Sequence, residues 1–348
     1  MSNTYYLNDI QIYDVLESST AIKAERSLLS TDTILIPDVN ITLLGNQYDP
    51  FRPNSIFYGL EDTLFKDIII TIINEDINSN IDCIIKDISY DVETNQCSLT
   101  LTPFISKKLE NTFEYYNDDI TPAQALLEIL ELNGLKDYID YPSFWNAKYS
   151  QSQSYMLISI TVTTDDKKKI IDIANEIGTL TCADIFIGTD SKIYYIQYNR
   201  YLNPYTPNDI QKNKILSMQI KKNNYDIINQ FALSTIYGSY TNDSDLGLTS
   251  RNNYGEISQD LSFESTQAIT SKYLNGMIWS GENWVYRNQK PKWVVELKCV
   301  NQLDYPLSLL DFFKLTFYND KVYEIIKVEQ SESDKTISIT GVSYEVGA

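Results

Sequence analysis

Two stretches of this chain repeat one pattern of three short strands. The first contains Asp67-Ile-Ile-Ile-Thr-Ile-Ile, Cys83-Ile-Ile-Lys-Asp and Ser98-Leu-Thr-Leu-Thr, and the second contains Asp311-Phe-Phe-Lys-Leu-Thr-Phe, Glu324-Ile-Ile-Lys-Val and Ser338-Ile-Thr-Gly-Val. In each, β-branched or aromatic runs are separated by polar residues, the pattern of an antiparallel meander. Chance is one explanation, because the chain is rich in Ile, Lys, Thr and Asn. A duplicated β module is the other, and it predicts that residues 65–105 and 308–345 form equivalent strands of two domains.

Composition indicates a folded, strongly acidic protein. With 348 residues the chain is long enough for two or three domains, and a hydrophobic fraction of 43% argues against disorder. The formal net charge is -19, from 47 acidic and 28 basic residues. Such a surface repels nucleic acid and anionic membranes. It is compatible with DNA passing a wall of like charge without binding to it.

Histidine is absent, which removes the most common general base and zinc ligand. The cysteines are far apart and form no C-x-x-C pair, so we expect core residues in a reducing compartment and no disulfides or thiolate metal site: Cys83, Cys97, Cys182 and Cys299. The N-terminus lacks a basic region followed by an apolar stretch, and no apolar run is long enough to cross a bilayer. We therefore expect a soluble protein without Sec export or membrane insertion.

The order of predicted elements indicates three domains: a first β-barrel-like domain at 1–108, a small α/β domain at 109–205, and a second β-barrel-like domain at 206–348. The fold class expected is α+β, mostly β. Predicted strands of the first domain are Leu7–Tyr13, Thr33–Ile36, Val39–Leu43, Ile68–Ile73, Asp82–Tyr90 and Gln96–Thr102. The last domain adds strands at 215–220 and 227–237, a polar loop at 239–258, and helical spacing at 263–279.

Two helices are predicted in the middle domain. Thr121 is the expected N-cap of the first, with Pro122 at the first helical position, Gln124 placed for a capping box, and Gly134 as the stop. The second has Thr164 as the expected cap, two aspartates in its first turn and Gly178 as its stop. Strands at 183–187 and 192–198 follow, joined by a hairpin-type turn.

Paired acidic residues are the only candidate catalytic groups that the sequence contains in quantity. They leave one enzyme class open, a glycosidase that works through two carboxylates. The pairs are Glu75-Asp76, Asp118-Asp119, Asp165-Asp166 and Asp243 with Asp245. Their positions in turns and at a helix start favour local hydrogen bonding instead. The loop at Asn242 resembles a calcium loop but has Gly247 where the spacing requires an oxygen ligand.

Motifs for nucleophilic catalysis and phosphate binding are absent from the sequence, including G-x-S-x-G, Ser-x-x-Lys, G-x-G-x-x-G and a Gly-Lys P-loop. We therefore expect no catalytic, cofactor-binding or metal-binding residues, and a protein that is not an enzyme. The densest aromatic patch is expected to pack a domain junction; it comprises Trp279, Trp284, Tyr286 and Trp293.

Several segments resemble bacteriophage baseplate or tail hub proteins. They are Thr121-Pro-Ala-Gln-Ala-Leu-Leu, Ile170-Ile-Asp-Ile-Ala-Asn-Glu-Ile-Gly, the hairpin from Ala183 to Ile196, Tyr225-Asp-Ile-Ile-Asn-Gln-Phe-Ala-Leu-Ser-Thr-Ile-Tyr-Gly, and the closing strands from Leu309 to Val342. The resemblance covers nearly the whole chain, although each motif is diffuse. It implies a homotrimer in which two tube-like β domains per subunit form a pseudo-sixfold ring.

Such a ring joins the sixfold tail tube to a threefold spike around a DNA channel. The resemblance implies partners in a tail tube or distal tail protein and in a central spike or tail tip protein, with DNA passing through unbound. It also implies a place in the virion tail after assembly in the bacterial host cytoplasm. The family has no shared catalytic residues or cofactors to carry over.

Two other functions stay open on the sequence alone. A receptor-binding or carbohydrate-binding tail module would also be rich in strands and in tyrosine, of which this chain has 27. A carboxylate glycosidase acting on the cell wall would need two acids converging in a cleft.

Overall fold

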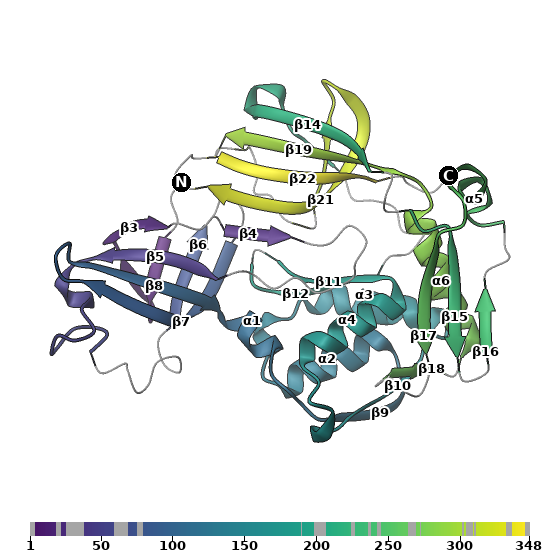
Figure 1. The fold of residues 1–348 in the computed structure, drawn as a ribbon, viewed down its shortest axis with the longest axis horizontal. Coiled ribbons are helices and arrows are strands. Elements are labelled where there is room, and N and C mark those ends of the chain that lie inside the picture. Colours follow the sequence, from purple (N-terminus) through teal and green to yellow (C-terminus); the bar gives the residue numbers. More distant parts are fainter. Residues whose placement is uncertain are drawn as a thin grey trace.

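The computed structural model describes residues 4–18, 22–25, 38–58, 69–74, 79–188, 190–197, 207–223, 227–235, 238–241, 245–263, 269–271, 273–300, 303, 309, 311–331 and 336–344. It contains two large sheets and a helical body, which lie at the left, top and bottom of Figure 1, respectively. The fold is mostly β, with barrel-like sheets and an α/β unit between them in the sequence, as predicted.

The first sheet has seven strands in the order β2-β1-β6-β7-β8-β5-β3, all antiparallel. Alternate residues of each strand point inward, as in β5, where Val39, Ile41 and Leu43 are buried. The predicted strand at 33–36 lies outside the described residues. The strands are β1 (Thr4–Leu7), β2 (Ile10–Ile12), β3 (Val15–Ser18), β5 (Val39–Leu44), β6 (Ile69–Asn74), β7 (Ser79–Asp91) and β8 (Gln96–Pro103).

The second sheet has the order β13-β20-β21-β22-β19-β14, and β4 from the N-terminal region joins it by pairing with β21. All pairs are antiparallel except β13 with β20. The strands are β4 (Ile22–Glu25), β13 (Asn208–Asp209), β14 (Ile215–Asn223), β19 (Lys292–Val300), β20 (Phe312–Leu315), β21 (Asn319–Ser331) and β22 (Thr336–Tyr344).

The two sheets share one topology. Neighbouring strands across the first sheet are β3-β5-β8-β7-β6, and across the second sheet they are β14-β19-β22-β21-β20. In both sheets the chain forms these strands in the same order, so each strand of one sheet corresponds to the strand at the same place in the other. The central strands β7 and β21 both have 13 residues. Each pairs at its start with the preceding strand and along most of its length with the following one. The repeat seen in the sequence therefore extends to five strands.

Two β-bulges occur at equivalent places in both sheets, and the second sheet has a further irregularity between Lys314 and Leu315 of β20. The extra residue is Lys86 in β7 and Ile326 in β21, the eighth position of each strand. A second bulge has Leu16 as its extra residue in β3 and Leu216 in β14, the second position of each strand. A bulge bends and twists its strand locally, so two matching bulges give two sheets the same curvature. The predicted equivalence of the strands in 65–105 and 308–345 is confirmed for the described residues.

The bulges correct one detail of the predicted alignment. Ser98 and Ser338 are equivalent, as predicted, because each pairs with the residue three places after the bulge. The Ile-Ile-Lys segments are one residue out of register, since Lys86 is equivalent to Ile326 and not to Lys327. The bulge is at the same position in both strands and does not cause this offset, so the Ile-Ile-Lys match is a similarity between non-equivalent positions.

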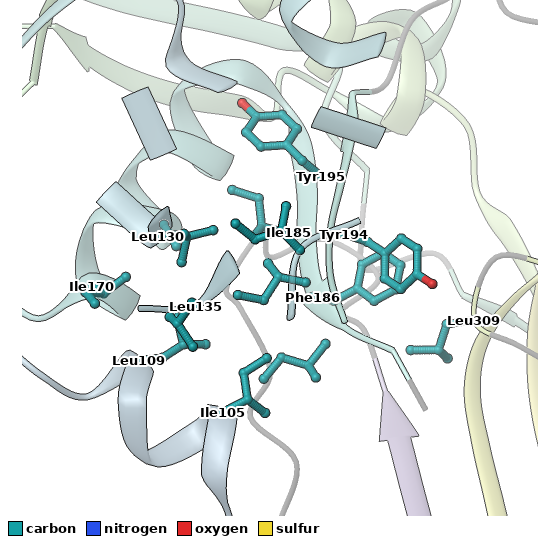
Figure 2. Packing of buried hydrophobic residues seen from close by; sticks show 14 of the residues in the cluster. Ile105, Leu109, Leu130, Leu135, Ile170, Ile185, Phe186, Tyr194, Tyr195 and Leu309 are labelled. Carbon is teal, nitrogen blue, oxygen red and sulfur yellow. The ribbon is translucent and has the colours of Figure 1, made fainter. Parts of the chain in front are cut away.

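The middle unit packs helices against small sheets. Figure 2 shows part of its core, where Leu109, Leu130, Ile170 and Ile185 come together from four different elements. The predicted hairpin is confirmed as β11 with β12. The elements up to residue 197 are α1 (Phe104–Leu109), β9 (Tyr115–Ile120), α2 (Pro122–Leu132), α3 (Tyr141–Gln153), β10 (Ile158–Val162), α4 (Ile170–Thr181), β11 (Ala183–Ile187) and β12 (Ile193–Gln197).

Helix α2 begins as predicted and ends before Gly134, whose φ is 76°. The Thr121 hydroxyl accepts the N–H of Gln124 at 3.4 Å. The Gln124 side chain does not complete the predicted capping box, because its amide donates to Glu128 one turn later at 2.9 Å. This contact keeps Glu128 in place to accept the Tyr115 hydroxyl at 2.7 Å.

The second predicted helix is wrong at both ends. Thr163, not Thr164, caps a separate 3-10 turn at Thr164–Asp166, and α4 itself begins at Ile170. Gly178 lies inside α4, which continues to Thr181 because Leu180 extends the buried face. Cys182 takes the left-handed conformation at the C-cap with φ 53°, so a non-glycine residue ends this helix.

The chain returns to the middle unit between the strands of the second sheet. The helix predicted near 263–279 is present but displaced: Ile269–Ser271 is strand β18, paired with β10, and the helix α6 runs over Leu274–Asn288. The predicted polar loop at 239–258 contains a short helix. The elements of this segment are β15 (Gln230–Thr235), β16 (Gly238–Thr241), α5 (Leu248–Tyr254), β17 (Ser258–Phe263), β18 and α6.

Helix α6 fastens this returning segment. The Trp284 indole donates to the carbonyl of Thr179 at 2.8 Å, and the Ser280 hydroxyl donates to that of Leu180, both at the end of α4. Gly281 lies against the ring of Phe231 in β15, where a Cβ would collide. The boundaries at 108 and 205 stay a prediction; the structure adds that residues 227–288 pack on the middle unit.

Equivalent positions in the two sheets have exchanged large and small side chains. Gly341 in β22 lies where β8 has Leu101, and a Cβ at Gly341 would be 2.6 Å from Cζ of Phe313. Phe313 itself lies where β6 has Ile70. We expect Gly341→Leu to lower the free energy of unfolding by about 1–3 kcal/mol through overpacking. Adding Phe313→Ile, which restores the pair of the first sheet, should recover much of this loss.

A double-mutant cycle measured by denaturant unfolding tests this coupling. The reciprocal pair Leu101→Gly and Ile70→Phe in the first sheet is the matched control, and it should show coupling of the same sign. Additive effects in both sheets would show that the two positions are not packing equivalents.

Candidate assembly interface

Among the predicted acidic pairs, Asp118 and Asp166 take part in structural hydrogen bonds. Glu75, Asp76 and Asp243 lie outside the described residues. Asp118 accepts the Ser159 hydroxyl between two strands, and Asp166 accepts the N–H of Thr163 at 2.7 Å. The Asp166 bond is local, as its position predicted, whereas the Asp118 bond joins strand β9 to strand β10. Across the part of the chain that the structure describes, no group of three or more His, Cys, Asp and Glu could hold a metal ion.

The four cysteines are buried and unpaired with one another, as predicted. Burial raises the pKa of the Cys182 thiol to about 12 and that of Cys299 to about 11. Both therefore stay protonated at neutral pH and pack as small apolar groups. No helix in the described ranges is long and apolar enough to cross a membrane.

The outer face of the first sheet carries hydroxyl, amide and carboxylate side chains together with the exposed apolar residues Leu44 and Ile69. Between the inward residues of β5 and β8, Thr100 donates to Asn40 at 2.9 Å and Thr102 donates to Asp38 at 2.8 Å. Lys86 at the bulge is 2.5 Å from Asp38. Burial by itself would raise the pKa of Asp38, but the hydrogen bonds from Lys86 and Thr102 lower this pKa overall. This part of the face is polar, and Lys86 on it is paired with Asp38.

The second sheet presents the same kind of face. Glu296 and Lys298 of β19 lie opposite Thr340 and Ser338 of β22, and Lys221 of β14 is 2.5 Å from Glu296. Each sheet thus has one apolar face on its core and one polar face with hydroxyls and paired charges. Two similar faces on one chain can line a common surface if the chains assemble around an axis.

Strand β4 connects the two modules through the backbone. It lies between β3 and β5 in the sequence, yet it pairs with Lys327–Gln330 of β21. Strand β20 covers only Asn319–Glu324 on that edge, so β4 pairs with the half that β20 leaves open. Unpaired strand edges are sites where further chain adds. The second module is completed by a strand from the connection within the first.

A buried charge cluster lies where α6 leads into β19. The Arg287 guanidinium donates to both carboxylate oxygens of Asp184 in β11, at 2.7 and 2.5 Å, and both side chains are at most one tenth exposed. Burial by itself would lower the pKa of Arg287, but the charge and hydrogen bonds of Asp184 raise this pKa overall. Lys292, at the start of β19, donates to Asn288 at 2.9 Å. Burial, and then the charge of Arg287, lower the pKa of Lys292 to about 8.

Three solved structures share this fold over nearly the whole chain. A 43 kDa tail protein of prophage MuSo2 from Shewanella oneidensis has a TM-score of 0.58 and 9% identity, with 99% of each chain covered. A tail protein from Neisseria meningitidis MC58 has a TM-score of 0.54 and 7% identity over 99% and 97%. Prophage tail protein gp18 from Listeria monocytogenes EGD-e has a TM-score of 0.52 and 8% identity over 100% and 96%.

No family model matches the chain, and no curated protein matches it in sequence. The three structures define the class of fold: it is that of phage and prophage tail proteins. The resemblance to bacteriophage baseplate or tail hub proteins is confirmed at this level, in the absence of appreciable sequence identity. The neighbours are tail proteins by description, and none is described as an enzyme.

The two sheets, the added strand β4 and the buried Arg287–Asp184 pair were only partly predictable from the sequence. The repeat indicated the two sheets, whereas β4, a four-residue strand in a polar segment, has no signal of its own. Arg287 and Asp184 are 103 residues apart, and nothing in their local sequence pairs them. Of the predicted aromatic patch, Trp284 is buried between α6 and α4, whereas Trp293 is exposed.

We expect Arg287→Met to lower the free energy of unfolding by about 3–5 kcal/mol, because Asp184 is then left buried without its partner. The double variant Arg287→Met/Asp184→Leu should be markedly more stable than Arg287→Met alone. Chemical denaturation of the three proteins measures both effects. A double variant no more stable than the single one would show that the pair is not the source of the loss.

Lys292 predicts a pH dependence of stability. Its pKa is about 8 in the folded protein, below the value of about 10.4 for an unperturbed lysine in an unfolded chain. Between these values the unfolded chain binds more protons, so the free energy of unfolding should rise with pH in this window. We expect the free energy of unfolding of the wild type minus that of Lys292→Met, measured by urea titration from pH 6 to about 9.5, to be constant below about pH 7. Above about pH 8 this difference should increase, because the wild type gains stability relative to the variant. A flat difference throughout would contradict it.

Proposed function

We propose that this chain is a structural subunit of a phage tail hub. Three copies form a ring, each copy contributes two sheets, and the six sheets surround a central channel. The observation that carries the proposal is the duplication itself: two sheets with the same strand order and the same two bulges in one chain. Such a chain can present sixfold features to one neighbour and threefold features to another.

In the proposed ring, the six similar modules contact a sixfold tail tube or distal tail protein. The single helical unit of each chain gives the threefold part, which contacts a central spike or tail tip protein. The subunit works in the virion tail after assembly in the host cytoplasm. Its role is to position other proteins and it performs no catalysis.

The charge of the chain supports a passage for DNA. With a net charge of -19, the ring carries excess negative charge, which disfavours sticking to the phosphate backbone. The polar outer faces of the sheets have hydroxyls and internally paired cations such as Lys86 with Asp38. We propose that these faces line the channel, with DNA passing unbound.

Native mass spectrometry of the purified chain tests the proposal. The 40.1 kDa chain should appear as a trimer that survives dilution into the micromolar range. A monomer that binds cell-wall glycans would overturn the hub and favour a carbohydrate-binding tail module. A trimer whose channel is lined mainly by unpaired lysine and arginine would retain the ring and overturn the proposed passage.

A further inference from the structure

Half of one strand edge in the first sheet has no partner among the described residues. Strand β7 runs over Ser79–Asp91, but β6 pairs only with its first part, up to Ile84. Beyond the bulge, β7 pairs with β8 on one side only. The other edge of Asp87–Asp91 is open in the part of the chain that the structure describes.

The direction of the backbone groups on this edge follows from neighbouring hydrogen bonds. Leu44 donates its N–H to Asp14, away from β8. In antiparallel ladders successive residues alternate in direction, so Cys97, which lies opposite Leu43, bonds to β5 and not to β7. The residues of β7 opposite Cys97 and Leu99, namely Tyr90 and Ile88, therefore direct their N–H and C=O groups to the open edge.

The side chain of Asp87 occupies part of this edge. Its carboxylate accepts the N–H of Ile88 at 2.9 Å. A residue that bonds its own neighbour's N–H acts as a substitute for a missing strand and can be displaced by one. The flanking Asp91 carboxylate is similarly turned to local N–H groups, those of Glu93 and Thr94.

The equivalent edge in the second sheet is occupied. Counting from the matched bulges, Ile88 and Tyr90 of β7 correspond to Val328 and Gln330 of β21. Those two residues lie opposite Ala24 and Ile22 of β4. The same stretch of the same strand thus carries an added strand in one module and none in the other.

We propose that the Asp87–Tyr90 edge of β7 receives an extended segment from a neighbouring copy of this chain, as β21 receives β4. This inference rests on the proposed ring. Where two modules alternate around a ring, contacts within a chain alternate with contacts between chains. The contact within the chain is β4 on β21, and the corresponding contact between chains falls on β7.

The matched variants Ile88→Pro and Ile88→Val test this edge. Proline removes the outward N–H and is tolerated at an edge that makes no ladder bond on that side. Both variants should give folded chains by circular dichroism. Ile88→Val should assemble like the wild type, whereas Ile88→Pro should weaken trimer formation at least about tenfold in native mass spectrometry, since it loses ladder bonds worth more than 1.4 kcal/mol in all.

Hydrogen exchange of the wild-type chain supplies a second readout. The amides of Ile88 and Tyr90 should exchange quickly in the diluted monomer and slowly in the trimer. If Ile88→Pro assembles normally, or if both amides exchange at equal rates in the two states, the β7 contact is overturned and the ring stands. If the wild type forms no trimer at any concentration, both the contact and the ring are overturned.

Discussion

The structure depends on how the backbone hydrogen bonds of a 13-residue strand are satisfied when the strand before it in the sequence is short. Strands β6 and β20 pair with only the first half of β7 and β21, and the backbone groups of the second half still need partners. In the second sheet β4 supplies them, which ties the N-terminal region to the last strands of the chain. In the first sheet, among the residues that the structure describes, the Asp87 carboxylate accepts one of these groups, the N–H of Ile88. One constraint therefore links the modules to each other and leaves a place for a further chain.

The two modules have kept their backbone and exchanged their side chains. Phe313 and Gly341 in the second sheet occupy the positions of Ile70 and Leu101 in the first. The large aromatic ring of Phe313 beside a glycine therefore replaces two aliphatic side chains of the first sheet. Close packing permits such exchanges when the total volume is maintained. Two of the bulges, by contrast, are backbone features that lie at the same positions in both sheets. Similar curvature with different cores is what equivalent positions in a ring require of two modules in one chain.

The sequence predicted the elements whose signals are local. Alternating strands, the N-cap of α2 and the β11–β12 hairpin followed from residue patterns. Helix α3 did not, because it has no apolar stripe; Gln151 holds it through bonds to Ala123, Tyr195 and Gln197 in the core. Its Asp140 cap and early proline were the available signal. The ends of α4, the position of α6, the bulges and the pairing of β4 depend on contacts between distant segments, which no local pattern contains.

The central claim is that one chain contributes two equivalent units to a ring, and cryo-electron microscopy of the assembled protein tests it most directly. The account predicts a trimer in which six sheets are related by an approximate sixfold axis, with their polar faces toward the channel and a strand from the neighbouring chain beside Ile88. An assembly in which the two sheets of a chain occupy unrelated environments, one of them away from the axis, would contradict it.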